Sequence, residues 1–250
     1  MNTYKQFYED YFISQKFSPE ESLKQKERIV LLEKIAKKLN AIGIGLIVGA
    51  GKGLEMGVGK GKVFALDLPF TYLPLLKEKF PDAFILQGDG TNMPFSDNTF
   101  DWLVCSEVLE HVPNREDMIS EFSRVLKPDG TLILTTPNWL CLYGLFRKLA
   151  EFFSGKPVHA GDQPLDQWTT PAKLRRELAP YFAIKRMWGW WYFPPIGRGE
   201  FQLFPKFFAA LWKILMPLER FFQVALPWFG HSVCVAAKPK KLEKRGKTEQ

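Results

Sequence analysis

A glycine-rich segment, Val48-Gly49-Ala50-Gly51-Lys52-Gly53, directly follows a short apolar run. Glycine lets the backbone turn tightly and approach a ligand closely, because no Cβ stands in the way. A helix that begins after such a loop presents free N–H groups to a carboxylate or a phosphate. We therefore expect Gly49, Gly51 and Gly53 to line a ligand site, although glycine-rich loops also serve simply as turns.

Two aspartates end the next two apolar runs along the chain. Asp67 ends one run, and Asp89 ends the other within Gly88-Asp89-Gly90-Thr91. In doubly wound folds an acid in the first position accepts hydrogen bonds from a ribose diol, and a carboxylate in the second can accept from the exocyclic amine of adenine. The alternatives are a solvated strand end for Asp67 and an Asx-type turn for Asp89. The carboxyl edge of successive strands is where open α/β sheets bind ligands, which favours a nucleotide-like site.

Alternating strands and helices must position these residues. The predicted strands cover 44–48, 63–66, 83–86, 102–105, 131–135, 183–188 and 232–237, and the predicted helices cover 18–39, 70–80, 115–127 and 171–179. Such alternation favours right-handed βαβ units and a parallel sheet. We therefore predict an α/β, Rossmann-like, doubly wound and mostly parallel seven-stranded sheet with helices on both faces and a helical, aromatic insertion near the C-terminus.

Three further segments carry a family resemblance. The run Gln87-Gly88-Asp89-Gly90-Thr91-Asn92-Met93-Pro94-Phe95-Ser96-Asp97-Asn98-Thr99-Phe100-Asp101 resembles the stretch GDA-x-x-LPF-x-D-x-SFD of class I S-adenosylmethionine-dependent methyltransferases. Residues 106–112, SEVLEHV, and residues 122–132, FSRVLKPDGTL, resemble later motifs of the same class. The most similar group is the ubiquinone/menaquinone-biosynthesis-like branch (methyltransferase type 11). The resemblance covers residues 42–138 and implies S-adenosylmethionine as the cofactor.

The resemblance also implies a cofactor-binding role for each matching residue. These residues are Gly49, Gly51, Gly53, Asp67, Leu68, Asp89, Gly90, Met93 and Ser106. The three glycines would line the methionine part of the cofactor, and Asp67 would hold the ribose hydroxyls with Leu68 beside the adenine. Asp89 and Gly90 would contact the adenine edge, and Met93 would pack on its face. Ser106 would lie near the sulfonium and amino groups.

Two departures from the family pattern concern the same loop. The family usually has Asp or Glu two residues before the first glycine, where this chain has Ile47, so a charged partner of the cofactor's amino end is missing. The helix expected after the loop, 54–60, is short and rich in glycine. Both features would weaken cofactor binding, and they keep open a non-catalytic binding protein with the same fold.

Methyl transfer from a sulfonium depends mainly on the positioning of the methyl donor and the acceptor, so the reaction does not by itself require a general base. A base is needed only if the acceptor must lose a proton. Glu110 and His111 match a pair that opens toward the substrate in this branch, so His111 is the candidate base, with a structural histidine at a helix end as the alternative. His159 and Asp162 are weaker candidates, and His231 is predicted to be structural. No metal site is predicted.

Aromatic residues dominate the segments expected to cover the acceptor, 1–17 and 137–200. They include Tyr4, Phe7, Tyr8, Tyr11, Phe12, Trp139, Trp168, Trp188, Trp190 and Trp191. They favour an apolar or planar acceptor, although they can equally fill a small core of their own.

Segment 201–229 is rich in Phe, Leu and Trp but is interrupted by three prolines. Short aromatic helices with basic residues can lie in a membrane interface, and the basic tail would add attraction to anionic lipid. The alternative is a helical hairpin that packs on the sheet or mediates dimerisation. Contact with a membrane would favour a lipid, a quinone-like ring or a lipid-linked glycan as acceptor.

Composition narrows the class of protein. The chain has 250 residues, 46% hydrophobic, three cysteines and a net charge of +7. We predict a cap at 1–40, a methyltransferase domain at 41–238 and a disordered basic tail at 239–250.

No apolar leader or long apolar run is present, which indicates a cytoplasmic protein with at most peripheral membrane contact. The positive charge permits an RNA methyltransferase, but no RNA-binding module or Asn/Asp-Pro-Pro-Tyr/Phe motif supports nucleic acid as the partner.

Overall fold

The computed structural model describes residues 5–10, 23–155, 165, 167–192, 218–219 and 221–240. The basic tail beyond residue 240 and residues 201–217 of the segment 201–229 lie outside these residues, as does the predicted start of the first long helix. The domain boundaries drawn from the sequence therefore stay predictions.

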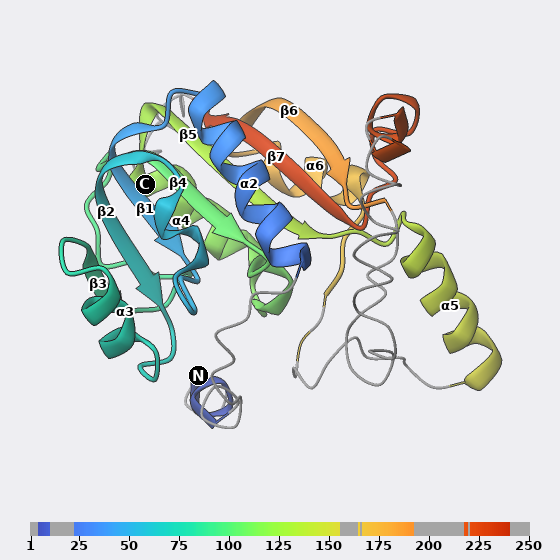
Figure 1. Ribbon diagram of the computed structural model, residues 1–250, viewed down its shortest axis with the longest axis horizontal. Coiled ribbons are helices and arrows are strands. Elements are labelled where there is room, and N and C mark those ends of the chain that lie inside the picture. Colours follow the sequence, from blue (N-terminus) through green and yellow to red (C-terminus); the bar gives the residue numbers. More distant parts are fainter. Residues whose placement is uncertain are drawn as a thin grey trace, which may run out of the picture.

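Seven strands form one sheet in the order β3-β2-β1-β4-β5-β7-β6 (Figure 1). Their bounds are β1 Ile42–Val48, β2 Lys60–Asp67, β3 Phe84–Gln87, β4 Phe100–Ser106, β5 Leu126–Pro137, β6 Phe182–Trp190 and β7 Ser232–Pro239. The pairs among β1 to β5 are parallel, whereas β7 is antiparallel to both β5 and β6. The predicted seven-stranded, mostly parallel sheet is confirmed, and six of the predicted strands lie inside the observed ones.

Helices cover both faces of this sheet, as predicted. They are α2 Leu23–Lys38, α3 Leu73–Lys79, α4 Arg115–Val125, α5 Leu142–Ser154 and α6 Pro171–Leu178, with the short 3₁₀ helices η1 Leu54–Gly57 and η2 Leu109–His111. One buried cluster joins α2 and α3 to one face of the sheet, and it includes Leu32 and Trp102. A second cluster joins α4 and α6 to the other face and includes Phe122 and Leu174. In Figure 1, α2 lies in front of the sheet and α4 and α6 lie behind it.

The helix expected after the glycine loop is reduced to the four-residue η1, so the prediction of a regular helix N-terminus there was wrong. Glycine is a poor helix former, and Gly59 and Gly61 adopt positive φ values of 82° and 111°, which end any helix. The preceding helix α2 covers this region instead, and its Leu32 shares a buried cluster with Met56 of η1.

Helix α5 lies in the segment 137–200, which was expected to be less regular and in which no helix was predicted at this position. It begins at Cys141, whose sulfur accepts a hydrogen bond from the Gly144 N–H at 3.1 Å, and it ends at Gly155 in the left-handed conformation. The terminal glycine and the spacing of Leu142, Leu145 and Leu149 are ordinary helix signals. They were obscured because the apolar stripe of this helix faces outward rather than into the core.

A fully buried indole fixes how closely the strands approach each other. Trp102 of β4 lies against the backbone of Gly45 in β1 and of Gly59 before β2. A Cβ at either glycine would overlap the ring. The glycines are therefore required by packing, and they set the position of β1 and of the loop that follows it.

We expect Gly45→Ala to lower the free energy of unfolding by about 1–3 kcal/mol, because the new methyl group overpacks the core against Trp102. Urea unfolding followed by circular dichroism would measure this. Gly57→Ala is the matched control, since a Cβ there would meet Glu33 at an ordinary 3.5 Å and should leave the stability equal or slightly higher. Equal stability of the two variants would contradict the packing argument.

Candidate functional site

The carboxyl ends of four neighbouring strands bring the predicted site residues to one edge of the sheet. Val48, the last residue of β1, pairs with Leu66 of β2 and Cys105 of β4. Asp67 at the end of β2 pairs with Gln87 at the end of β3. The glycine loop, Asp67, the Asp89 turn and Ser106 therefore lie along the same edge, in the order expected for an extended ligand.

The carboxylate of Asp67 is held by two backbone groups. The Gly51 N–H donates to Oδ2 at 2.5 Å, and the Leu68 N–H donates to Oδ1 at 2.8 Å. Burial raises the pKa of Asp67 to about 6, while these two hydrogen bonds oppose the rise. Nearby Glu55 and Glu9 add to it. Each carboxylate oxygen retains lone-pair capacity, so the group can still accept from two hydroxyls.

The three loop glycines differ in what surrounds them. All three have positive φ: 74° at Gly49, 45° at Gly51 and 76° at Gly53. A Cβ at Gly49 would overlap Val108, and one at Gly53 would overlap Leu76 of α3. At Gly51, by contrast, no described atom lies within 4 Å of the Cβ position. Gly51 therefore borders open space, whereas the lining role of the other two stays a prediction.

Asp89 forms an Asx-type turn, which is the alternative role that the sequence allowed for this residue. Its Oδ1 accepts from both the N–H and the hydroxyl of Thr91, each at 2.8 Å. Its Oδ2 receives no hydrogen bond from any residue that the structure describes. The same side chain can therefore fix the turn and accept from an adenine amine. Gly90 packs against Met118 of α4, where a Cβ would overlap the thioether.

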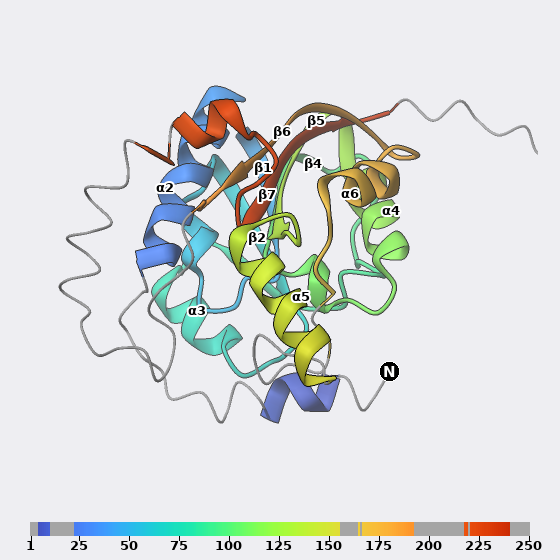
Figure 2. The same cartoon turned by 90° about the vertical axis from the view of Figure 1, so that its right-hand side faces the viewer.

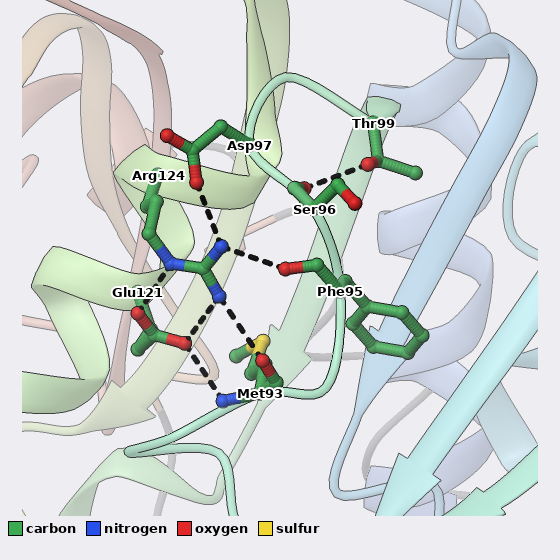
Figure 3. A network of polar contacts seen from close by, with 7 residues as sticks. All are labelled: Met93, Phe95, Ser96, Asp97, Thr99, Glu121 and Arg124. Atoms are coloured by element: carbon green, nitrogen blue, oxygen red, sulfur yellow. Dashed lines mark hydrogen bonds and ion pairs between the residues drawn. The ribbon is translucent and has the colours of Figure 1, made fainter.

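An arginine network fixes the loop that carries Met93 (Figure 3). The guanidinium of Arg124 donates to the carbonyls of Met93 and Phe95 at 3.0 and 2.6 Å, to Asp97 at 2.8 Å, and to both oxygens of Glu121. Glu121 also accepts from the Met93 N–H at 2.7 Å. The hydrogen bonds from Arg124 lower the pKa of Glu121. Arg124 belongs to the motif at residues 122–132, but no role was predicted from the sequence for Arg124 or for Glu121.

A second polar chain runs beneath the glycine loop and was also missed. Glu55 of η1 is 4% exposed and pairs with Arg28 of α2 at 2.9 Å. Burial raises the pKa of Glu55, and Arg28 opposes this rise. The hydroxyl of Ser106, at the end of β4, lies 2.9 Å from that of Thr135 in β5. Ser106 is thus tied to the neighbouring strand.

His111 lies in η2 with its ring held on one side. Its Nδ1 is 2.7 Å from the Leu165 carbonyl oxygen, and its Nε2 is 3.7 Å from Glu110. A carbonyl can only accept, so Nδ1 carries a proton, and Nε2 is the basic nitrogen of the neutral ring. Buried Glu110 accepts from Thr136 at 3.1 Å. The geometry suits both a structural histidine and a base, so the catalytic role of His111 stays a prediction.

His231 packs as the sequence reading expected of a structural residue. Its ring lies edge-on to Trp168, with the ring centres 5.2 Å apart, and Nδ1 is 3.9 Å from the Cys141 sulfur. His159 and Asp162 lie outside the described residues.

The five tryptophans expected near the acceptor divide into two groups. Trp190 and Trp191 are buried in the core on the α2 face, and Trp188 packs against them. Trp139 and Trp168 instead lie 5.2 Å apart beyond the end of β5, with the Arg147 guanidinium about 5 Å from both rings. Both groups lie toward the carboxyl edge of the sheet, because Trp190 of β6 and Pro137 of β5 both pair with Ser232 of β7.

The described N-terminal residues contact the loop after β2 (Figure 1). Glu9 accepts from the N–H groups of Phe70 and Thr71 at 2.5 and 3.1 Å, and from the Thr71 hydroxyl at 2.6 Å. Partial burial acts to raise the pKa of Glu9, but these hydrogen bonds lower it overall. Tyr8 is buried and lies edge-on to Phe7. Tyr4, Tyr11 and Phe12 lie outside the described residues, so an aromatic lid stays a prediction.

Residues 46–134 match the model of the methyltransferase domain family. This segment is a class I S-adenosylmethionine-dependent methyltransferase domain. The predicted family resemblance is confirmed, and the match contains the glycine loop, Asp67, Asp89, Met93, Ser106 and His111.

Curated relatives match a similar share of the chain. The demethylmenaquinone methyltransferase of Staphylococcus epidermidis is 33% identical over 113 residues, which are 41% of this chain and 47% of the relative. The demethylmenaquinone methyltransferase of Paenarthrobacter aurescens is 31% identical over 123 residues, 46% and 49% of the two chains. The chain thus spans about half the length of the curated relatives it matches.

Solved structures share the fold across most of the chain. A SAM-dependent methyltransferase from Thermotoga maritima superposes with a TM-score of 0.59 at 15% identity and covers 96% of this chain and 99% of its own. Among the residues the structure describes, no helix is long and apolar enough to span a membrane.

We expect Arg124→Leu to lower the free energy of unfolding by about 1–3 kcal/mol, since it removes several charge-assisted hydrogen bonds at a partly exposed site. The variant should also bind S-adenosylmethionine more weakly, because the Met93 loop loses its anchor. Thermal unfolding and calorimetric titration would measure both. Asp97→Asn is the control, because that carboxylate is 68% exposed and makes only one of the contacts. Unchanged binding by Arg124→Leu would contradict the positioning role.

Proposed function

We propose that the protein transfers a methyl group from S-adenosylmethionine to an apolar, quinone-like or lipid-like acceptor at a membrane surface. The observation that supports this proposal most directly concerns Asp67. The backbone N–H groups of Gly51 and Leu68 orient its two carboxylate oxygens, and open space borders Gly51. A carboxylate held in this way suits a ribose diol, which donates two hydrogen bonds.

The residues along the sheet edge fit the remaining parts of this cofactor. Asp67 would hold the ribose, and the open Oδ2 of Asp89 would accept from the adenine amine. Gly51 would allow the cofactor to approach the backbone closely, and Ser106 would lie near its amino-acid end. When bound, the cofactor supplies an electrophilic methyl group on a sulfonium. The protein's part is then to hold donor and acceptor in line and to keep water out.

The acceptor class rests on the relatives and on the aromatic groups. The named relatives act on demethylmenaquinone, as their names state. Trp139 and Trp168 form an aromatic pair beyond the end of β5, in which Trp168 is buried against Tyr143 and His231, and such aromatic surroundings are compatible with a planar ring nearby. His111 would serve as a base if the acceptor had to lose a proton, since its Nε2 is the basic nitrogen of the neutral ring.

The membrane part of the proposal rests on the outer face of α5. Leu142, Leu145, Leu149, Phe152 and Phe153 form one apolar stripe, and both phenylalanines are 81% exposed. In Figure 2, α5 faces the viewer with no described helix in front of it. Lys148 is exposed on the same helix, and a lysine beside an apolar stripe suits an anionic bilayer surface.

A second exposed apolar patch supports the same orientation. Phe221, Val224 and Trp228 are all more than half exposed. Their segment is fixed to the end of β6 by Glu219, which accepts from the N–H groups of Trp191 and Tyr192. Burial raises the pKa of Glu219, against the hydrogen bonds from Tyr192 and Trp191. Figures 1 and 2 place this segment above α5, at the same end of the sheet.

We expect the affinity for S-adenosylmethionine to be constant above about pH 7 and to fall up to about tenfold per unit below pH 6. The charged Asp67 accepts from the diol, and in the free protein its pKa is raised to about 6, so acid protonates the group that binding requires. Asp67→Asn should bind about 10–100-fold more weakly at pH 7.5 and lose this pH dependence. Calorimetric titration from pH 5 to 8 would measure both. Parallel profiles in the two proteins would refute the ribose assignment.

The transfer reaction is tested in the same preparation with a methyl-labelled cofactor and a membrane lipid extract. Label in the organic phase, and its loss with Asp67→Asn, are the expected results. Label on RNA would favour the RNA methyltransferase instead, and absence of cofactor binding at millimolar concentration would favour a non-catalytic binding protein.

We expect the protein to co-sediment with vesicles of phosphatidylcholine and phosphatidylglycerol. The double variant Phe152→Ser, Phe153→Ser should reduce the bound fraction more than about tenfold, because each buried aromatic contributes about 1.5–3 kcal/mol. The matched control is Val30→Ser, Leu75→Ser, which removes two exposed apolar side chains from α2 and α3. Equal sedimentation of the two double variants would exclude α5 as the contact surface.

A further inference from the structure

A single carboxylate joins the N-terminal segment, residues 5–10, to the loop that follows β2. Glu9 Oε1 accepts from the Phe70 N–H at 2.5 Å and from Gln87 Nε2 at 3.4 Å. Its Oε2 accepts from the N–H and the hydroxyl of Thr71, at 3.1 and 2.6 Å. These partners lie 61 to 78 residues further along the chain. Donors from two parts of the sheet edge therefore converge on one side chain from a distant part of the sequence.

The same contacts lead to the carboxylate that we propose for the ribose. Gln87 Nε2 also donates to the Leu68 carbonyl at 3.0 Å, and the Leu68 N–H donates to Asp67 Oδ1 at 2.8 Å. Gln87 in turn pairs directly with Asp67 in the parallel register of β2 and β3. Glu9 therefore holds the stretch from Leu68 to Thr71 at both of its ends, directly at Thr71 and through Gln87 at Leu68.

The N-terminal segment lies on the same edge of the sheet as the site. In Figure 1, residues 5–10 lie beyond the arrowhead of β2, the strand that ends at Asp67. Tyr8 is 8% exposed, so the segment packs onto the protein rather than projecting into solvent. Glu9 itself is partly exposed, and water can therefore replace its contacts when the segment opens. Such an opening leaves the sheet intact.

We infer that Glu9 is a positioning residue for the cofactor, which latches the N-terminal segment onto the loop 68–71 and slows release of the adenosine half. This inference rests on the proposed function and deepens it. A carboxylate that accepts from backbone N–H groups forms charge-assisted hydrogen bonds, which are stronger than those of a neutral acceptor. The closed latch keeps Leu68 in the position from which its N–H orients Asp67.

The test measures the binding kinetics of S-adenosylhomocysteine to the full chain by stopped-flow tryptophan fluorescence. This ligand has no sulfonium, so loss of a nearby negative charge does not change a direct attraction to one. Glu9→Gln should raise the dissociation rate constant about tenfold and leave the association rate constant equal or higher. The compound 5′-methylthioadenosine has the same adenine and ribose without the amino-acid end, and it should show the same change.

Asp10→Asn is the matched control. It removes the same charge from the same segment, but Asp10 is exposed and accepts from Gln6 within its own helical turn. Both rate constants should therefore equal those of the wild type. Thr71→Val tests the contact from the other side, because it removes one donor to Glu9. It should raise the dissociation rate constant by a smaller factor, about two- to fivefold, and it serves as the test should Glu9→Gln fail to fold.

Hydrogen exchange separates positioning from folding. Bound S-adenosylhomocysteine should slow exchange of the Phe70 and Thr71 amides in the wild type, and this protection should be lost in Glu9→Gln. Wild-type dissociation rates in Glu9→Gln and Thr71→Val, an equal effect of Asp10→Asn, or a change confined to S-adenosylhomocysteine would overturn the inference while the proposed function stands. No binding of S-adenosylmethionine or of either analogue by the wild-type protein would overturn both.

Discussion

The hydrogen bond from the Gly51 N–H to Asp67 is the interaction on which the site depends. It joins the loop after β1 to the end of β2, and it orients a carboxylate that burial alone would leave poorly stabilised. The loop reaches this position only because Gly49, Gly51 and Gly53 all adopt positive φ, and because Gly45 allows β1 to lie directly on Trp102. The packing of one indole under the sheet therefore determines where a backbone N–H meets a carboxylate at its edge.

Two arginine networks then hold the two ends of the site, and they do so in different surroundings. Arg124 is partly exposed and binds mainly backbone carbonyls and carboxylates of one loop, so it acts by fixing the chain near Met93. Arg28 lies beneath the glycine loop and meets a carboxyl group that is almost fully buried. Screening by water weakens the first kind of contact, whereas loss of water strengthens the second. The first network suits the anchoring of a loop, and the second joins α2 to the short helix that follows the glycine loop.

The strands and the carboxylates at their ends were predictable because their signals are local. Continuous apolar runs end at Asp67 and before Asp89, and both residues follow the same rule for open α/β sheets. Glu55 and Arg124 gave no such signal, since their partners Arg28 and Met93 lie 27 and 31 residues away. The reduction of the first helix to η1, by contrast, follows from the local sequence, since glycine is a poor helix former and Gly59 and Gly61 adopt positive φ. Helix α5 was missed for the opposite reason, as its apolar side chains do not contribute to the core.

The match to the methyltransferase domain family ends at residue 134, and this explains why the acceptor must be inferred from this protein's own residues. The family match ends there, and it contains all the groups assigned to the cofactor. Trp139, Arg147, the outer face of α5 and Trp168 all come later in the chain. Counting tryptophans does not identify the acceptor side, because Trp190 and Trp191 fill the core while Trp139 and Trp168 lie beyond β5. In α5, one face contacts this aromatic pair through Arg147 while the opposite face presents Phe152 and Phe153 outward. The exposed stripe and the aromatic pair are therefore opposite faces of one helix, so α5 separates the apolar outer surface from the aromatic group at the end of β5.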